Sequence, residues 1–544
     1  MIPLFLDIET NGEDTYSEKY LLRLIGYKTP GCAPKVTYPG HKDFENVKSL
    51  IQSKDTRVVA WSNYDYFGLK SAGVVPANYY DLKIPFKLYN ENWRLSLDEI
   101  IPKIGFQSHK YLVKMWEQEG YNWATVPMEH LVPYNKLDVQ RTSDAWEWVQ
   151  GKFPKDQDEF LQKANRALIE LQGVGIGFDP AASENLRYCY EGDLAVKWEL
   201  LKNQADINWN SGDQVGDYLK SQKIPIRLTP KKNYRIDEEY LETHKDQYPV
   251  LSDLLNYRRL NHLYETYVVG VRDSVKGDGL LHPRYSWAST WRYRTSAPNI
   301  QNFPKKSSVR KVIVSKFPGG KLVEVDWSQL ELRLMAVTAD DKVLLGELQQ
   351  GQDIHQRTAT ELGVSRDEGK SINFLIRYGG SAWKIHKTFP VSLEKAEWFV
   401  AQQYRRYPAM KVYSDMSQKK CWNKEPILTL FGRPRHTTSL NEALNSPIQS
   451  AGADLNKLVL LYTLETGSTY TSHPVFDVHD ALIFDVAPEE FQKYLDNVIK
   501  KAYAGISELV GSEFGGELGN RFRQLTWPYK IKVGINYAKM GETE

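Results

Sequence analysis

The most specific stretch of this 544-residue sequence reads Arg366-Asp-Glu-Gly-Lys-Ser-Ile-Asn-Phe-Leu-Ile-Arg-Tyr-Gly-Gly380. A spacing of four residues is kept by Arg366, Lys370, Phe374 and Tyr378. On an α-helix each step of four drifts by about 40°, so these side chains share one face. That face offers two cations and then two aromatic rings, which suits a triphosphate followed by a sugar and a base.

Two aspartates lie on either side of this segment in the sequence. Lys321–Asp326 predicts a strand that leaves Asp326 at its exposed end, and Trp327–Arg333 predicts the opening of an amphipathic helix. Far along the chain, Val475–Val486 predicts two strands around a tight turn that contains Asp480. Two aspartates from distant segments can hold a pair of metal ions about 3.5–4 Å apart, the arrangement that phosphoryl transfer uses.

A second acidic set lies near the N-terminus. Asp7 and Glu9 are two residues apart on a predicted strand, Pro3–Ile8 and its continuation, so they share a face and repel each other unless a cation joins them. Tyr134 and Asp138 are four residues apart on a predicted helix and face the same way.

This second set resembles the DEDD superfamily of 3′→5′ exonucleases, in the form that carries a tyrosine. The resemblance implies two divalent metals bound by Asp7, Glu9, Asp65 and Asp138, with Tyr134 orienting the attacking water. Asp65 follows Asn63 at a shorter spacing than that family uses, and Asp81 stays open as an alternative to Asp65 as the third acid.

The first set resembles the family A DNA polymerases, the DNA polymerase I family. Val325–Arg333 is similar to motif A, Arg366–Gly379 to motif B and Asp477–Asp480 to motif C. Further similar segments, in the expected order, are Asn210–Leu219, Thr290–Pro304, Gln352–His355, Thr429–Arg435 and Asn445–Gln449. The resemblance spans essentially the whole chain.

The family implies a role for each matching residue. The catalytic and metal-binding acids are Asp326 and Asp480, with Lys370 as a catalytic cation, and Mg²⁺ is the expected cofactor, two ions in each active site, with Mn²⁺ as a substitute. Nucleotide binding is assigned to Arg366, Lys370, Phe374, Tyr378, His355, Gln329 and Glu331, the last as a gate against the 2′-hydroxyl. Contacts to primer–template DNA are assigned to Arg292, Asn299, Gln301, Arg433, Asn445, Gln449 and His479.

Some positions depart from the family pattern. Trp291 stands where a glycine is usual, Leu375 and Arg377 replace a glycine and an apolar residue, and Ala481 replaces a glutamate. These departures leave the details of the template and nucleotide contacts open, including a preference for a modified base.

The expected fold class is α/β and α+β multidomain, with an RNase H-like exonuclease domain followed by a right-hand polymerase. We expect the exonuclease in residues 1–150 and the polymerase in 151–544, with a charged linker over Lys152–Glu159. Within the polymerase we expect the thumb at about 160–285, the palm at about 286–350 and 440–544, and the fingers at about 351–439. The expected partners are primer–template DNA, deoxynucleoside triphosphates and a single-stranded DNA 3′ end.

Composition is compatible with this interpretation. The net charge is only +2, which allows local basic grooves beside acidic metal sites. Three dispersed cysteines exclude a zinc framework. The sequence lacks a signal peptide and an apolar run of about 20 residues, so we expect a cytoplasmic protein. The compact form is typical of bacteriophage enzymes. The rival interpretations are a single-subunit RNA polymerase, a non-catalytic DNA-binding subunit and an exonuclease alone.

Overall fold

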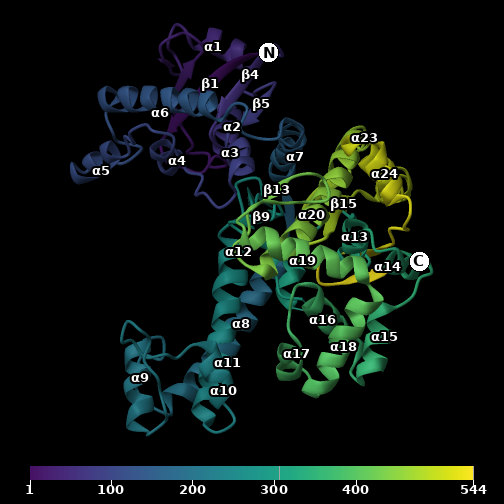
Figure 1. Ribbon diagram of the computed structural model, residues 1–544. Coiled ribbons are helices and arrows are strands. Elements are labelled where there is room, and N and C mark those ends of the chain that lie inside the picture. Colours follow the sequence, from purple (N-terminus) through teal and green to yellow (C-terminus); the bar gives the residue numbers. More distant parts are fainter. Residues whose placement is uncertain (306, 543–544) are drawn as a thin grey trace.

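The computed structural model describes residues 1–305 and 307–542. Figure 1 shows an N-terminal α/β domain, a central sheet covered by long helices, a helical region around α15–α18, and an arm of helices α8–α11 that projects away from the rest. This confirms the predicted multidomain class that mixes α/β and α+β parts.

The N-terminal domain is built on a five-stranded sheet in the order β3-β2-β1-β4-β5. Its central strand β1 pairs antiparallel with β2 and parallel with β4. Leu4, Phe5 and Leu6 of β1 are buried on both faces, which is why the strand reads as a continuous apolar run. The strands are β1 (Ile2–Thr10), β2 (Leu22–Lys28), β3 (Lys35–Thr37), β4 (Thr56–Ala60) and β5 (Tyr79–Asp81). The helices are α1 (Phe44–Ile51), α2 (Asn63–Ser71), α3 (Lys83–Tyr89), α4 (Leu97–Lys103), α5 (Tyr111–Gln118) and α6 (Met128–Val149).

A second five-stranded sheet forms the centre of the molecule, in the order β14-β15-β11-β16-β17. It packs against the 27-residue helix α20, and their side chains form the largest buried core. Its strands are β11 (Lys321–Trp327), β14 (His473–Val478), β15 (Ala481–Val486), β16 (Tyr529–Gly534) and β17 (Met540–Glu542). The helices of this region include α7 (Lys155–Val174), α13 (Leu330–Ala339), α20 (Leu440–Thr466), α21 (Phe491–Tyr494), α22 (Lys500–Ala504), α23 (Ile506–Phe514) and α24 (Gly516–Phe522).

Two helical regions flank the central sheet. The projecting arm consists of α8 (Pro180–Lys202), α9 (Gly212–Ser221), α10 (Glu238–His244) and α11 (Pro249–Leu263), which continues through a π-helical turn (Tyr264–Val269) into α12 (Gly270–Arg272). The other region holds α14 (Lys342–Gln349), α15 (Ile354–Leu362), α16 (Arg366–Arg377), α17 (Ala382–Thr388), α18 (Leu393–Arg406) and α19 (Pro408–Trp422). Short strands complete the fold: β6 (Ile176–Phe178), β7 (Leu280–Leu281), β8 (Arg284–Trp287), β9 (Tyr293–Ser296), β10 (Ile313–Val314), β12 (Ile427–Leu428) and β13 (Pro434–Arg435).

Two local predictions are wrong. The charged stretch Lys152–Glu159 is not a linker throughout, because α7 begins at Lys155 and Asp158 is already buried in its first turn. The helix predicted from Trp327 begins only at Leu330, since β11 extends through Trp327 and Gln329 takes a left-handed conformation (φ 56°) before the helix. That helix is also not amphipathic: Leu330 and the run Leu332–Val337 are all buried.

None of the helices within the described part of the chain combines the length and the apolar character needed to cross a membrane.

Candidate active sites

The N-terminal acids meet where β1 lies beside α6. The strand puts Asp7 and Glu9 on one face, and the helix brings Asp138 to them, so that oxygen atoms of the three carboxylates lie within 4.8 Å of one another. Asp65, near the start of α2, accepts a hydrogen bond of 3.3 Å from the backbone N–H of Ile8, the residue between Asp7 and Glu9. Three of the four acids that the sequence suggested therefore meet, and the fourth, Asp65, lies beside the strand that carries two of them.

Asp81, the alternative acid, faces elsewhere. Its Oδ1 accepts a 2.9 Å hydrogen bond from the backbone N–H of Lys83, and its backbone is held by the amide of Gln162 on α7. The geometry favours Asp65 over Asp81 as the neighbour of Asp7 and Glu9.

Burial and mutual repulsion make the acidic cluster electrostatically costly. Burial, with Asp138 nearby, raises the pKa of Glu9 to about 8, and burial raises the pKa of Asp65 to about 7. The pKa of Asp7 lies well above its usual range, because of burial and then repulsion from Asp138, Glu9 and Asp65. Oxygen ligands of this kind suit Mg²⁺, and a bound divalent cation would relieve the repulsion, so these residues fit a metal site.

The side chains of Tyr134, His109 and Lys110 complete this site. Tyr134 is buried one helical turn before Asp138, as predicted from the spacing of four. His109 Nε2 lies 3.0 Å from Asp138 Oδ1, and Lys110 Nζ lies 3.6 Å from Asp138 Oδ2. Neither His109 nor Lys110 was predicted from the sequence, because both come from the irregular segment between α4 and α5 and only the tertiary fold brings them to the acids.

The second site lies at the end of the central sheet. Strand β11 pairs with β15 so that Asp326 is opposite Ala481, and Asp480 occupies the turn between β14 and β15. His479, beside it, is exposed with a left-handed backbone (φ 57°). Burial, followed by repulsion from Asp480, raises the pKa of Asp326, which again favours a cation between the two carboxylates.

A polar network joins this turn to the helices around it. One nitrogen of the Arg292 guanidinium lies 3.1 Å from Asp480 Oδ1 and 3.1 Å from Glu331 Oε1. The hydroxyl of Tyr378, at the end of α16, donates a 2.5 Å hydrogen bond to Glu331 Oε2. Glu331 is therefore fixed from two sides, and Arg292 links it to Asp480.

Helix α16 carries Arg366, Lys370 and Phe374, and Tyr378 follows directly at its C-terminal end. Ser365 and Glu368 form a capping box that starts the helix at Arg366. The rings of Phe374 and Tyr378 stack with their centroids 5.9 Å apart, and the His355 ring lies 5.8 Å from Phe374. Lys370 is exposed and, within residues 1–305 and 307–542, forms no ion pair, whereas Arg366 pairs with Asp353 at 2.7 Å.

His355 is buried on the neighbouring helix α15. Its Nδ1 lies 3.2 Å from the amide of Asn373, and burial, followed by the positive charge of Arg377, lowers its pKa to about 4. The imidazole is therefore neutral at physiological pH and carries no full positive charge.

The residues assigned to DNA contacts fall into two groups. Partly or fully exposed side chains near the second site belong to Arg292, Asn299, Gln301, Asn445, Gln449 and His479. Gln301 also supports the sheet, because its amide donates to both oxygens of the buried Asp477 at 3.2 Å.

Arg433 differs from that group. It is fully buried, ion-paired to Asp454 at 2.5 Å, and its guanidinium lies 5.2 Å from the ring of Trp291. A side chain that is enclosed in this way cannot reach DNA on the surface, so we assign Arg433 to the packing beneath the site. Trp291, which replaces a glycine of the family pattern, is buried there with a left-handed backbone (φ 61°).

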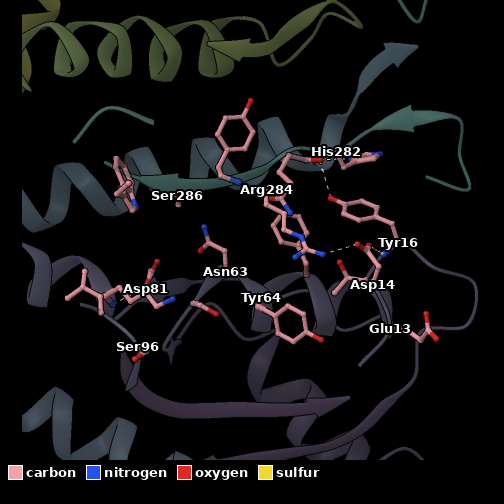
Figure 2. A pocket seen from close by; sticks show the side chains of 18 of the residues that line it. Glu13, Asp14, Tyr16, Asn63, Tyr64, Asp81, Ser96, His282, Arg284 and Ser286 are labelled. Atoms are coloured by element: carbon pink, nitrogen blue, oxygen red, sulfur yellow. Dashed lines mark hydrogen bonds and ion pairs between the residues drawn. The ribbon is translucent and has the colours of Figure 1, made fainter. Parts of the chain in front are cut away.

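A cavity of about 650 Å³ lies between the N-terminal domain and β8 with the chain before it (Figure 2). One end is closed by Asp14, whose Oδ2 lies 3.0 Å from Lys276 Nζ and 3.2 Å from an Arg284 nitrogen. The Tyr16 ring stacks on His282 at 4.1 Å, and its hydroxyl donates to the carbonyl of Gln172. These contacts tie the segment that follows β1, and so the acids of β1, to the rest of the molecule.

Residues 193–510 match the model of a family described as DNA polymerase family A. The DNA polymerase I of Caldicellulosiruptor bescii is 30% identical over 373 residues, which cover 61% of this chain and 43% of that protein. The DNA polymerase I of Borreliella burgdorferi is 26% identical over 543 residues, covering 91% of this chain and 59% of the relative. The chain thus spans about half the length of such relatives.

A solved structure, the polymerase domain of Pol1 from M. smegmatis in complex with DNA primer-template and dNTP, is similar with a TM-score of 0.76. The match covers 98% of this chain and 96% of that one at 18% sequence identity. The likeness therefore extends over both five-stranded sheets and shows that the overall fold is shared.

Proposed function

Because the chain belongs to DNA polymerase family A, we propose that it is a DNA-templated DNA polymerase that adds deoxynucleotides to a primer 3′ end, with a separate 3′→5′ exonuclease site in its N-terminal domain. The substrates would be primer–template DNA and deoxynucleoside triphosphates at the site on the central sheet, and a single-stranded DNA 3′ end at the site in the N-terminal domain.

The proposal rests above all on the network that joins Asp480, Arg292, Glu331 and Tyr378. It joins a carboxylate of the turn beside the sheet to a tyrosine at the end of α16. Asp326 and Asp480 would hold two Mg²⁺ ions, with Mn²⁺ as a substitute, and the ions would neutralise the attacking 3′ oxygen and the leaving pyrophosphate.

The chain's own side chains would position the nucleotide. Lys370 and Arg366 carry the charges for its phosphates, and the neutral His355 adds a hydrogen bond. Phe374 and Tyr378 would pack against the sugar and the nascent base pair. Glu331, held by Arg292 and Tyr378, fills the space beside the 2′ carbon, so a ribonucleotide would meet a fixed carboxylate.

The primer–template would lie along the exposed residues near the second sheet. Arg292 and His479 are placed at the aspartate turn, where a primer end must come. Asn299, Gln301, Asn445 and Gln449 would contact the duplex, and Gln329 would contact the nucleotide from the start of α13.

The exonuclease proposal is supported by the buried cluster of Asp7, Glu9, Asp65 and Asp138. These acids would hold two divalent cations, and the hydroxyl of Tyr134 would orient the attacking water. We further propose a replicative role in a bacteriophage, and this role stays a prediction.

The domain limits follow from the same proposal. We assign 1–150 to the exonuclease and 151–544 to the polymerase, with the fingers at about 351–439 and the palm at about 286–350 and 440–544. Helix α7 packs against α3 of the N-terminal domain and against α20, so we propose that the thumb proper is the projecting arm that begins with α8.

Primer extension with Mg²⁺, using deoxy- or ribonucleoside triphosphates in parallel, tests the proposal. We expect extension with deoxynucleotides only. Extension with ribonucleotides alone would favour a single-subunit RNA polymerase, and no extension with either set would favour a DNA-binding subunit or an exonuclease.

A further inference from the structure

Lys110 brings a positive charge into contact with the N-terminal acidic cluster. It precedes α5, and its Nζ donates a hydrogen bond to the hydroxyl of Tyr134. The same ammonium lies 4.8 Å from the centroid of the Tyr134 ring and 3.6 Å from Asp138 Oδ2. One side chain therefore contacts both Tyr134 and Asp138 of α6.

The positive charge of Lys110 acts beyond these two contacts. It opposes the rise in the pKa of both Asp7 and Glu9, so it stabilises the ionised form of each. The side chain is 38% exposed, whereas that of Asp138 is only 5% exposed, so the lysine has open space to move into and the acid does not.

A metal ion bound by the acidic cluster would be repelled by this ammonium group. Mg²⁺ binds carboxylate oxygens at about 2.0–2.1 Å, which would bring it close to a positive charge already 3.6 Å from Asp138 Oδ2. Repulsion between like charges at such a distance is substantial even near the surface.

We propose that Lys110 is a positioning residue with two roles: it holds the hydroxyl of Tyr134 in place, and it is the internal counter-ion that a divalent cation must displace from Asp138. The inference rests on the proposed exonuclease function. Once displaced, the flexible lysine is free to meet the phosphate of the bound strand.

The test measures metal binding apart from activity. Mn²⁺ binding to the full chain is followed by electron paramagnetic resonance, in an Asp326→Asn, Asp480→Asn background that removes the second site. Lys110→Met should bind Mn²⁺ roughly tenfold more tightly, because a competing charge is gone. Lys110→Arg should bind like the parent, and Lys114→Met, an exposed lysine one turn further along, is the matched control.

Activity then separates the two roles. At saturating Mn²⁺ we expect Lys110→Met to lose at least tenfold in kcat on a single-stranded oligonucleotide, with partial recovery in Lys110→Arg. A disordered site would bind Mn²⁺ more weakly, so unchanged or weaker binding by Lys110→Met overturns the inference. If the parent degrades no DNA but Lys110→Met still binds more tightly, the exonuclease proposal fails and the counter-ion role stands.

Discussion

The hydroxyl of Tyr378 donates a 2.5 Å hydrogen bond to Glu331, across the space between α16 and α13. Arg292 holds the other carboxylate oxygen at 3.1 Å. This arrangement gives Glu331 a fixed position, as a steric barrier requires.

We therefore expect Glu331→Ala to admit ribonucleotides, because truncation opens the space that a 2′-hydroxyl needs. The measurement is the ratio of kcat/KM for ribo- and deoxynucleoside triphosphates. Tyr378→Phe, which removes one of the two supports and leaves the carboxylate, should relax the ratio less. An unchanged ratio in Glu331→Ala would contradict the proposed barrier.

Asp326→Asn or Asp480→Asn should abolish primer extension and spare 3′→5′ degradation, since each carboxylate belongs to the central sheet and not to the N-terminal domain. Loss of one metal-binding carboxylate should lower extension by orders of magnitude, because charge neutralisation is the main contribution of the protein to phosphoryl transfer. Extension at the parental rate by either variant would rule out these residues as metal ligands.

The double variant Asp7→Ala, Glu9→Ala should show the reverse pattern. Removal of two of the four clustered acids should stop degradation of a single-stranded oligonucleotide, while extension of a matched primer continues. Persistent degradation would disprove the N-terminal assignment, and a parallel loss of extension would reveal that the two sheets depend on each other for folding.

Asp14 should make the docking of the N-terminal domain sensitive to acid. Burial alone would raise its pKa, but hydrogen bonds from the Tyr16 backbone and from Lys276 outweigh burial and hold the pKa below its usual value. Its contribution is therefore present above the unfolded pKa of about 3.9 and is lost as the pH falls through the lower folded pKa.

We accordingly expect Asp14→Asn to lower the free energy of unfolding by about 0.2–1 kcal/mol at pH 7, a typical range for solvent-exposed ion pairs. Thermal unfolding at pH 7 and at pH 3 measures the difference, which should shrink at the lower pH. An equal difference at both pH values would mean that the ion pairs with Lys276 and Arg284 contribute nothing.

Local patterns in the sequence predicted much of both sites, because their key residues lie close together on single elements. Asp7 and Glu9 on β1, Tyr134 and Asp138 on α6, and the aromatic pair of α16 all follow from strand or helix periodicity. His109 and Lys110 carry no such signal, since an irregular segment brings them to Asp138 only in the folded chain.

The burial of individual charged side chains was also not predictable from the periodicity of the sequence. Arg433 belongs to a segment similar to one that serves DNA, yet Asp454 on α20 and the ring of Trp291 enclose it. The start of α7 was missed for a related reason: the charges of Lys155–Glu159 indicated a solvated linker, but Asp158 accepts a hydrogen bond from the buried Tyr80 across the domain boundary.

Phe374 offers the sharpest test of how α16 faces the nucleotide. Its ring stacks on Tyr378 and lies near His355, on the face that also carries Lys370, so it should lie beside the sugar once the phosphates are bound. Phenylalanine has no hydroxyl, so the 3′-hydroxyl of a normal nucleotide must form its hydrogen bond within the nucleotide, and a dideoxynucleotide should be a poor substrate.

Phe374→Tyr would supply the missing hydroxyl. Its hydrogen bond would be worth about 0.5–1.5 kcal/mol, or about 1.5–3 kcal/mol to a charged group. Since about 1.36 kcal/mol is tenfold in rate, dideoxynucleotide use should improve by roughly tenfold or more. The ratio of kcat/KM for deoxy- and dideoxynucleotides, in the Asp7→Ala, Glu9→Ala background, measures this, and an unchanged ratio would mean that Phe374 does not face the sugar.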